Sequence, residues 1–152
     1  MTSPSARLRE LGVTLPSVAA PAGSYVPARR SGSLVFTAGQ VPFVDGALAA
    51  AGKVGAEITL EQAAGLARIC ALNALAAVDA LVGLDAVAGV VKVVGFVASA
   101  PGFTGQPGVL NGASDLLAEV FGEAGRHARS AVGVAELPLG APVEVELVVE
   151  LA

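Results

Sequence analysis

Cysteine, histidine and aromatic residues are scarce in this chain of 152 residues. It has one cysteine, Cys70, one histidine, His127, and no tryptophan, and aromatic residues make up only 4% of it. A single cysteine excludes an intrachain disulfide and fits a reducing compartment. One cysteine and one histidine far apart in the sequence do not form a set of metal ligands, so the sequence gives no support for a metal site.

Charged residues are also few, at 14% of the chain, and the net charge of −4 with a pI near 4.9 is acidic. Proteins that bind nucleic acids normally carry a basic face, whereas the basic residues cluster here only at Arg29–Arg30 and at Arg126 and Arg129. These clusters are too small to follow a phosphate backbone. We therefore expect no nucleic-acid partner.

Apolar residues, by contrast, make up 54% of the chain, and the mean hydropathy is +0.72. The richest stretch, residues 69–91, is interrupted by Asn73, Asp79, Asp85 and two glycines, so we expect no membrane span. The N-terminus has no apolar signal core, which predicts a cytoplasmic protein. One small core cannot hide so much apolar surface, which predicts an oligomer that buries the excess between subunits.

The order of the predicted elements indicates an α+β fold. Strands are expected at residues 25–30, 34–39, 87–99, 129–135 and 143–151. Helices are expected at residues 59–83, where Thr59 and Gln62 can form a capping box, and at about 109–121. A chain of this length forms one domain, and the order β-β-α-β-α-β-β predicts a mixed sheet with two helices packed on one face. The other face of the sheet then needs a partner.

The last two predicted strands carry the most informative charges. Arg129 stands in a run of very small residues, and a guanidinium at the mouth of an apolar pocket is a receptor for a carboxylate. The residues on its face of the strand are Ala131, Gly133 and Ala135. In the last strand Glu144 alternates with apolar residues, as do Glu146 and Glu150. An ion pair with a glutamate is the structural alternative for Arg129, and a solvated acidic stripe is the alternative for Glu144.

Four motifs in a fixed order carry a resemblance that covers nearly the whole chain. The first is Tyr25, which stands fifteen residues before Gln40 of the motif Thr37-Ala38-Gly39-Gln40. The second is the run Val90–Val97, and the third is Asn111, placed to open the second helix. The fourth is Ala128-Arg129-Ser130, followed by Leu137-Pro138 and Val143–Glu146. With these motifs the sequence resembles the RidA family, also called YjgF/YER057c/UK114. The last motif is the most specific of the four.

The resemblance implies a chorismate-mutase-like fold, a homotrimer with clefts between its subunits, and no cofactor. It also implies hydrolysis of 2-imino acids, the tautomers of reactive enamines, to 2-oxo acids and ammonia. The chain departs from the family pattern at His127, at Ala131, in a longer loop over residues 100–110 and in an N-terminal extension of about residues 1–18. These departures indicate a divergent subgroup of the family.

Hydrolysis of an imine needs an anchor for the substrate carboxylate, a protonated nitrogen and a positioned water. Arg129 is the natural anchor, and Glu144 can orient or deprotonate the water. Backbone groups near Gly39 can hold the amine end, and Tyr25 can close the pocket. The expected site therefore has Arg129 and Glu144 as catalytic residues, and Tyr25, Gly39, Asn111 and Ser130 as substrate-binding residues. Tyr25 as a packing residue and Asn111 as a helix cap are equally simple interpretations.

The short connection over residues 137–142 predicts a local hairpin between the last two strands. Arg129 would then lie opposite about Glu150, and Glu144 opposite about Ala135, which separates Arg129 from Glu144 by about 20 Å along the sheet. On this assumption the two side chains of one chain cannot meet. They could share a site only across a subunit interface.

Other functions stay open at this point. One is a dedicated degradative step that acts on some other small carbonyl or imine compound. A non-catalytic module of the same shape could bind small carboxylates or a protein partner and report on metabolite levels. Ribonuclease activity or inhibition of translation, names often attached to the family, is disfavoured by the acidic pI and by the lack of a basic groove.

Overall fold

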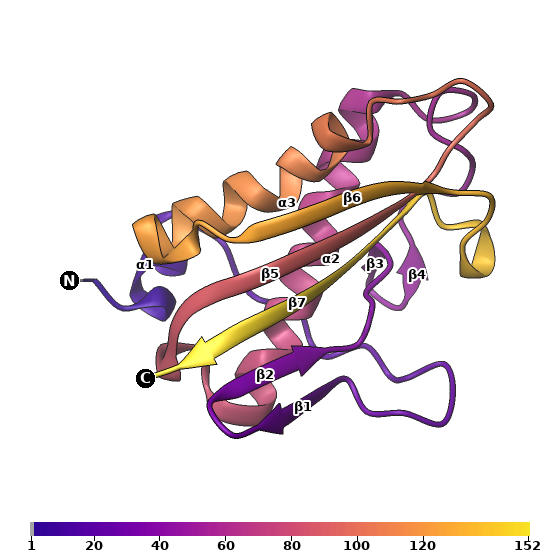
Figure 1. Cartoon of the computed structure of the whole chain (residues 1–152). Helices are drawn as coiled ribbons and strands as arrows, with labels where there is room; N and C mark the ends of the chain where they lie inside the picture. The colour runs from indigo at the N-terminus through magenta and orange to yellow at the C-terminus, as the bar shows by residue number, and fades with distance from the viewer. Residues whose placement is uncertain (1) are drawn as a thin grey trace.

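The computed structural model describes residues 2–152 and centres on a five-stranded mixed sheet (Figure 1). The strands are β1 (Ala28–Ser31), β2 (Leu34–Thr37), β5 (Val87–Ala98), β6 (Ala128–Val134) and β7 (Val143–Leu151). They are arranged in the order β1-β2-β7-β5-β6, and only β5 and β6 run parallel. A separate hairpin of β3 (Phe43–Val44) and β4 (Ala47–Leu48), which was not predicted, lies outside this sheet.

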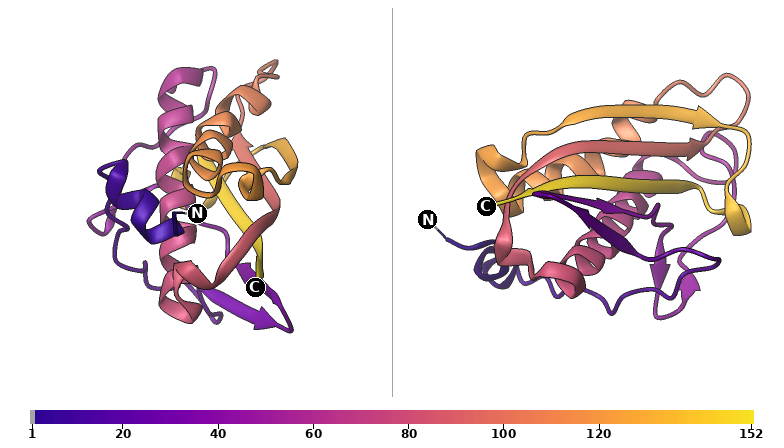
Figure 2. Two further views of the ribbon diagram at one scale, coloured as in Figure 1. Left: turned by 90° about the vertical axis from the view of Figure 1, so that its left-hand side faces the viewer. Right: turned by 60° about the horizontal axis from the view of Figure 1, so that its bottom comes forward.

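The two long helices, α2 (Leu60–Val82) and α3 (Gln106–Phe121), cover one face of the sheet and leave the other uncovered (Figures 1 and 2). This arrangement confirms the predicted α+β fold. The remaining helices are short: α1 (Pro4–Glu10), η1 (Leu84–Ala86), η2 (Gly122–Gly125) and η3 (Pro138–Gly140). Three predicted boundaries were wrong by two residues or more. Strand β1 begins at Ala28 instead of Tyr25, β2 ends at Thr37 instead of Gly39, and α3 begins at Gln106 instead of about Val109.

Helix α2 begins at the predicted capping box. The Thr59 N–H donates to Gln62 Oε1 at 2.9 Å, and the Gln62 N–H donates to Thr59 Oγ1 at 3.1 Å. By length and composition α2 could cross a membrane, but 56% of its most apolar window is buried against the rest of the chain. Alanines on α2 and Gly112 on α3 let the two helices approach closely. Because many residues of α2 are buried, it is the central helix of the core.

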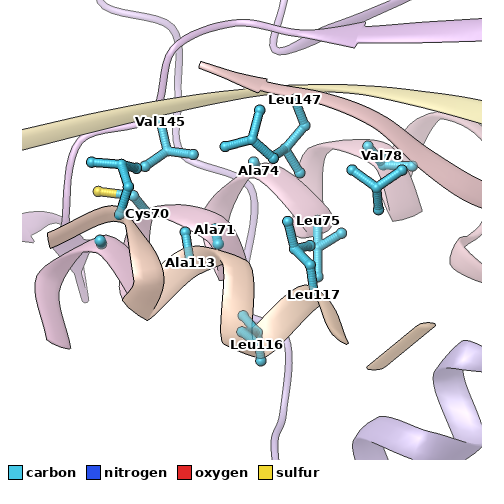
Figure 3. Packing of buried hydrophobic residues seen from close by; sticks show 14 of the residues in the cluster. Cys70, Ala71, Ala74, Leu75, Val78, Ala113, Leu116, Leu117, Val145 and Leu147 are labelled. Atoms are coloured by element: carbon cyan, nitrogen blue, oxygen red, sulfur yellow. The ribbon is translucent and has the colours of Figure 1, made fainter. Parts of the chain in front are cut away.

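The core lies between the helices and the covered face of the sheet. Strand β7 alternates as predicted, and Val143, Val145, Leu147 and Val149 are fully or almost fully buried. Figure 3 shows two of these side chains meeting residues of α2 and α3, among them Cys70, Ala74, Leu75 and Leu117. Cys70 is buried in this core, and burial raises the pKa of its thiol well above the usual value.

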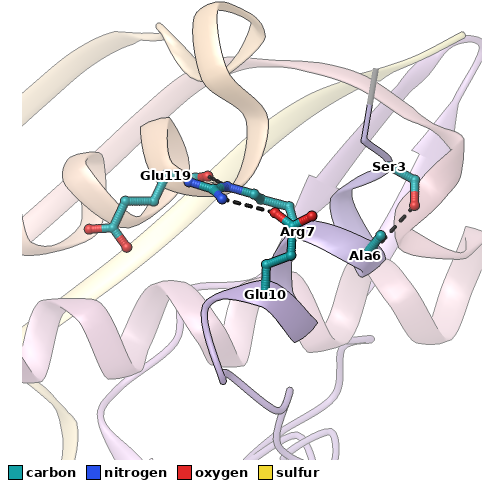
Figure 4. Close-up of polar contacts among 5 residues, drawn as sticks. All are labelled: Ser3, Ala6, Arg7, Glu10 and Glu119. Carbon is teal, nitrogen blue, oxygen red and sulfur yellow. Dashed lines mark hydrogen bonds and ion pairs between the residues drawn. The ribbon is translucent and has the colours of Figure 1, made fainter.

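The N-terminal helix α1 is fastened to the far end of the helical layer. The Arg7 Nε–H donates to the Glu119 carbonyl at 2.9 Å, and its guanidinium pairs with Glu10 at 3.0 Å (Figure 4). Ser5 donates to Asp85 through its backbone N–H and its hydroxyl. The segment between α1 and β1 then runs along the molecule to the opposite end, where it borders the cleft described below.

The predicted hairpin of the last two strands was wrong, because β5 lies between β6 and β7. The connection from β5 to β6 contains α3, and such a crossover places the second strand parallel to the first. Strand β7 pairs with the other edge of β5. Arg129 is therefore level with Val93 and Leu147, and Glu144 is level with Phe96 and Val132.

The uncovered face of the sheet is apolar at several points. Phe36, Val91 and Val132 keep more than 40% of their surface exposed there. Glu144, Glu146 and Glu150 of β7 share this face, since they alternate with the buried valines and leucines. We call this surface the open face.

Candidate functional site

A cleft at one end of the open face brings three of the predicted site residues together. Four residues line both of its parts, Tyr25, Gly39, Pro138 and Glu144, and we call them the neck. An inner lobe of about 180 Å³ lies on one side of the neck. Its further lining residues include Ala19–Ala22, Val41, Phe43 and Leu139. An outer lobe lies on the other side, over the open face, and is lined by Val26, Arg29 and Phe36 as well as the neck.

A β-bulge positions Gly39 in the neck. Phe36 pairs with Val148 and Gln40 bridges to Val145, so the segment of β2 contains one residue more than β7 over this interval. The Thr37 hydroxyl accepts the Leu147 N–H at 2.9 Å, which satisfies the donor that the interrupted ladder leaves free. In the described part of the chain the Gly39 N–H has no hydrogen-bond partner, and it is thus available to a ligand.

Gly39 lies directly against the carboxylate of Glu144. A Cβ atom at position 39 would be 2.6 Å from Glu144 Oε1 and 2.8 Å from its Cδ, both too close for ordinary contact. The absence of a side chain therefore lets the carboxylate rest on the backbone of the bulge. This close approach explains why glycine stands in the sequence Thr-Ala-Gly-Gln.

Glu144 is a half-buried carboxylate with no ionic partner among residues 2–152. Burial raises the pKa of Glu144 above its ordinary value, and the neighbouring Glu146 adds to the increase. A carboxylate with a raised pKa holds a proton more readily and is a better general base. Its place in the cleft distinguishes it from Glu150, which is exposed to solvent.

Tyr25 borders both lobes and is held by a local contact. Its hydroxyl accepts the Ala22 N–H at 3.1 Å, and about half of its side-chain surface is exposed. The ring therefore lines the cleft instead of packing into the core. Its hydroxyl hydrogen stays free to donate to a ligand.

Arg129 lies on the opposite face of the sheet from Glu144. Its guanidinium donates to Asn111 Oδ1 at 2.8 Å and to Ser114 Oγ at 3.2 Å, both on α3. No carboxylate within residues 2–152 forms an ion pair with Arg129, so the alternative of an internal pair with glutamate was wrong. Asn111 is the sixth residue of α3, so it neither opens nor caps the helix and instead orients the arginine.

Ser130 follows Arg129 but points to the other face. It is level with Val94, which pairs with Glu146 on the open face. One chain thus gathers Tyr25, Gly39 and Glu144 in the cleft and leaves Arg129, Asn111 and Ser130 outside it. From the strand spacing, Arg129 and Glu144 are about 10 Å apart along the strands and about 10 Å apart across β5.

Several residues of the cleft were not predicted from the sequence. Pro138 and Leu139 come from the connection between β6 and β7, and the inner wall of residues 19–22 comes from the irregular segment before β1. Leu139 has a φ of 63°, which is unusual for a leucine and signals local strain at the rim. No three His, Cys, Asp or Glu side chains in the described chain gather closely enough to hold a metal ion.

Comparison with known proteins identifies the family of the chain. A family model described as "YjgF/chorismate_mutase-like, putative endoribonuclease" matches residues 5–151. The chain belongs to the YjgF/chorismate mutase-like family. The fold with two helices on one face of a mixed sheet is thereby that of the family, as the sequence motifs had indicated.

Three known proteins are similar to this chain over nearly its whole length. Protein TCP17 of Trypanosoma cruzi is 49% identical over 149 residues, which cover 97% of this chain and 93% of that protein. Atu1372 of Agrobacterium tumefaciens, whose function is unknown, is 45% identical with a TM-score of 0.89, covering 98% of this chain and 92% of that one. TdcF of E. coli, solved with bound serine, is 26% identical with a TM-score of 0.65, covering 91% and 96%.

Proposed function

We propose that the protein hydrolyses reactive 2-imino acids, the tautomers of enamines, to 2-oxo acids and ammonia without a cofactor. The observation that carries the proposal is the cleft itself. It places a half-buried carboxylate with a raised pKa, Glu144, beside a free backbone N–H at Gly39 and the hydroxyl of Tyr25. A relative with bound serine supports a ligand of this size and chemistry.

The reaction adds one water to the carbon–nitrogen double bond. The substrate reacts as the iminium ion, with its nitrogen already protonated. Glu144 accepts a proton from the water while the water oxygen attacks the iminium carbon, and the electron pair of the double bond moves to the nitrogen and neutralises it. The resulting carbinolamine loses ammonia when the nitrogen takes up a proton and the new hydroxyl loses one. The products are the 2-oxo acid and ammonia, and no redox step occurs. General base catalysis of this kind contributes roughly 10²–10⁴-fold.

The site is completed by a neighbouring copy of the chain in this proposal. Arg129 lies on the other face of its own sheet and cannot reach its own Glu144, whereas Arg129 of a neighbouring copy can anchor the substrate carboxylate. The exposed apolar side chains of the open face give such an assembly its driving force. We propose a homotrimer, as the family resemblance implies, and a location in the cytoplasm, as the N-terminal sequence predicts. A mass in solution equal to one chain would contradict the shared site.

A coupled assay tests the activity directly. An amino-acid oxidase generates 2-iminopropanoate or 2-iminobutanoate, and semicarbazide traps whatever imine remains. The wild type should suppress trapping, and Arg129→Ala should not. If the wild type acts on no imine but binds 2-oxobutanoate in a calorimeter, the non-catalytic carboxylate-binding module is the better description.

Ribonuclease activity, which the description of the family model mentions, is disfavoured by the charge of the open face. The three carboxylates on that face, Glu144, Glu146 and Glu150, outnumber its basic residues Arg29 and Lys92, and carboxylates repel a phosphate backbone. The chain as a whole carries a net charge of −4. RNA cleavage that survives stringent purification and depends on Glu144 would reverse this conclusion.

A further inference from the structure

The outer lobe of the cleft contains an arginine that comes from the same chain as Glu144. Arg29 lies on β1 opposite Phe36 of β2, so the two side chains project from the same face of the sheet. Phe36 is exposed on the open face, and both residues line the outer lobe together with Tyr25 and Glu144. Arg29 therefore lines the outer lobe from the same face of the sheet as Phe36 and Glu144.

Arg29 has no anionic partner of its own. Within residues 2–152 its side chain forms no ion pair, and no side-chain hydrogen bond is found for it. Its neighbour Arg30 differs on both points. Arg30 is opposite the buried Val35, on the other face, and its Nε–H donates to the Gly32 carbonyl at 2.9 Å. Of this pair of arginines, only Arg29 is both in the cleft and unpaired.

Arg29 and Glu144 border the same lobe without neutralising each other. No contact within ion-pair distance joins them, and the pKa of Glu144 is raised by burial and by Glu146 instead of lowered by a nearby cation. The lobe thus has room for a negatively charged group between the two side chains. A guanidinium binds a carboxylate with two parallel hydrogen bonds, which makes a carboxylate the best match.

The inner lobe on the other side of the neck has the opposite character. Ala19–Ala22, Val41, Phe43 and Leu139 give it a hydrocarbon wall. Its volume of about 180 Å³ is similar to the roughly 150 Å³ of a cavity that holds one benzene molecule. A ligand that lies across the neck would have its charged end outside and a hydrocarbon group of up to about six carbons inside.

We propose that Arg29 binds the carboxylate of the substrate, so that an imino acid lies across the neck with its hydrocarbon side chain in the inner lobe. This assignment rests on the proposed function for the identity of the substrate. Arg29 acts from the same chain as Glu144 and Tyr25, and Arg129 of the neighbouring copy acts from the other side of the interface. The carbon–nitrogen double bond then lies beside Gly39 and Glu144.

The experiment compares Arg29→Gln with Arg30→Gln as a matched control. Two quantities are measured for each: the Kd of 2-oxobutanoate, the product, by calorimetry, and KM and kcat with 2-iminobutanoate in the coupled assay. For an exposed charged hydrogen bond we expect Arg29→Gln to raise Kd and KM by about 10-fold. Since the contact is made equally in the ground and transition states, kcat should change less than about 2-fold. Arg30→Gln should leave Kd and KM unchanged.

A second variant and a second substrate make the result specific. Arg29→Lys keeps the charge but not the planar fork, so its Kd should lie between those of the wild type and Arg29→Gln. Imines derived from leucine should be hydrolysed with a higher kcat/KM than the imine derived from aspartate, because a second carboxylate cannot enter the inner lobe without losing its hydration. A higher kcat/KM for the aspartate imine would overturn the proposed orientation.

The outcomes separate this assignment from the proposed function. If the wild type hydrolyses imines and Arg29→Gln behaves like the wild type or like Arg30→Gln, the role of Arg29 is refuted and the function stands. If the wild type binds 2-oxobutanoate through Arg29 but hydrolyses no imine, the role of Arg29 is supported and the hydrolase is refuted. If it neither binds nor hydrolyses, both are refuted.

Discussion

Gly39→Ala offers a direct test of whether the position of the Glu144 carboxylate governs the reaction. The added Cβ would lie 2.6 Å from Glu144 Oε1, whereas ordinary contact begins at 3.4 Å, a shortfall of about 0.8 Å. The backbone of the bulge is held by hydrogen bonds between Gln40 and Val145, so it moves less easily than the side chain. The carboxylate is therefore expected to move, and the fold to stay intact.

A displacement of this size has a large effect on a catalysed step and a small effect on stability. Misplacing a catalytic group by about 1 Å can reduce the rate by about 100-fold, so we expect kcat to fall by about 10- to 100-fold in Gly39→Ala. Gly39 does not need a left-handed backbone, and the end of a glutamate side chain can swing aside. The free energy of unfolding should thus change by less than about 1 kcal/mol.

The assay is the imine-trapping assay with 2-iminobutanoate, together with urea unfolding of each variant. Gly65→Ala is the matched control, because a Cβ at this exposed position on α2 would meet no atom within 4 Å. That variant should keep the wild-type kcat and gain up to about 1 kcal/mol of stability from its higher helix propensity. A wild-type kcat in a folded Gly39→Ala protein would refute the role that we assign to Glu144.

Two further predictions concern stability. In Gly112→Ala the new Cβ would press against the backbone carbonyl of Ala64 and force α2 and α3 apart, so the free energy of unfolding should fall by about 1–3 kcal/mol. Urea unfolding measures this loss, with Gly65→Ala as the control. An unchanged midpoint would contradict the prediction. The pKa of Glu144 is raised in the folded state above its ordinary value of 4.5, so the folded protein holds this proton more tightly than the unfolded chain does. The wild type should therefore lose stability as the pH rises from 4.5 through the pKa of the folded state. Glu144→Gln should remove that loss. The free energy of unfolding of the variant in urea, relative to that of the wild type, should therefore be larger at pH 7 than at pH 4. A difference that does not change with pH would exclude this explanation.

Much of the fold was predictable because its signals are local. The capping box at Thr59, the alternation of β7 and the β-branched run of β5 each involve residues that are neighbours along one element. Such patterns depend on the 3.6-residue and 2-residue periods of helices and strands, which act wherever the element is placed. The motif order then indicated the family that the comparison confirmed.

The pairing of the strands was not predictable from the short connection between β6 and β7. A short loop suggests a hairpin. In the structure, however, β6 pairs with one edge of β5, to which the α3 crossover connects it, and β7 pairs with the other edge of β5. The prediction that Arg129 and Glu144 of one chain do not share a pocket agrees with the structure, although its reasoning was wrong. The two residues are separated by the sheet itself, and no hairpin register is involved.

The sequence alone determined the type and order of the main elements and which residues of each strand share a face, because these depend on local periodicity. Only the tertiary structure decided which faces meet. It placed Gly39 against Glu144 through a bulge, turned Arg129 toward Asn111, and set Arg29 in the outer lobe. These contacts join residues far apart in the chain, and their geometry depends on strand order and register, which no local pattern specifies.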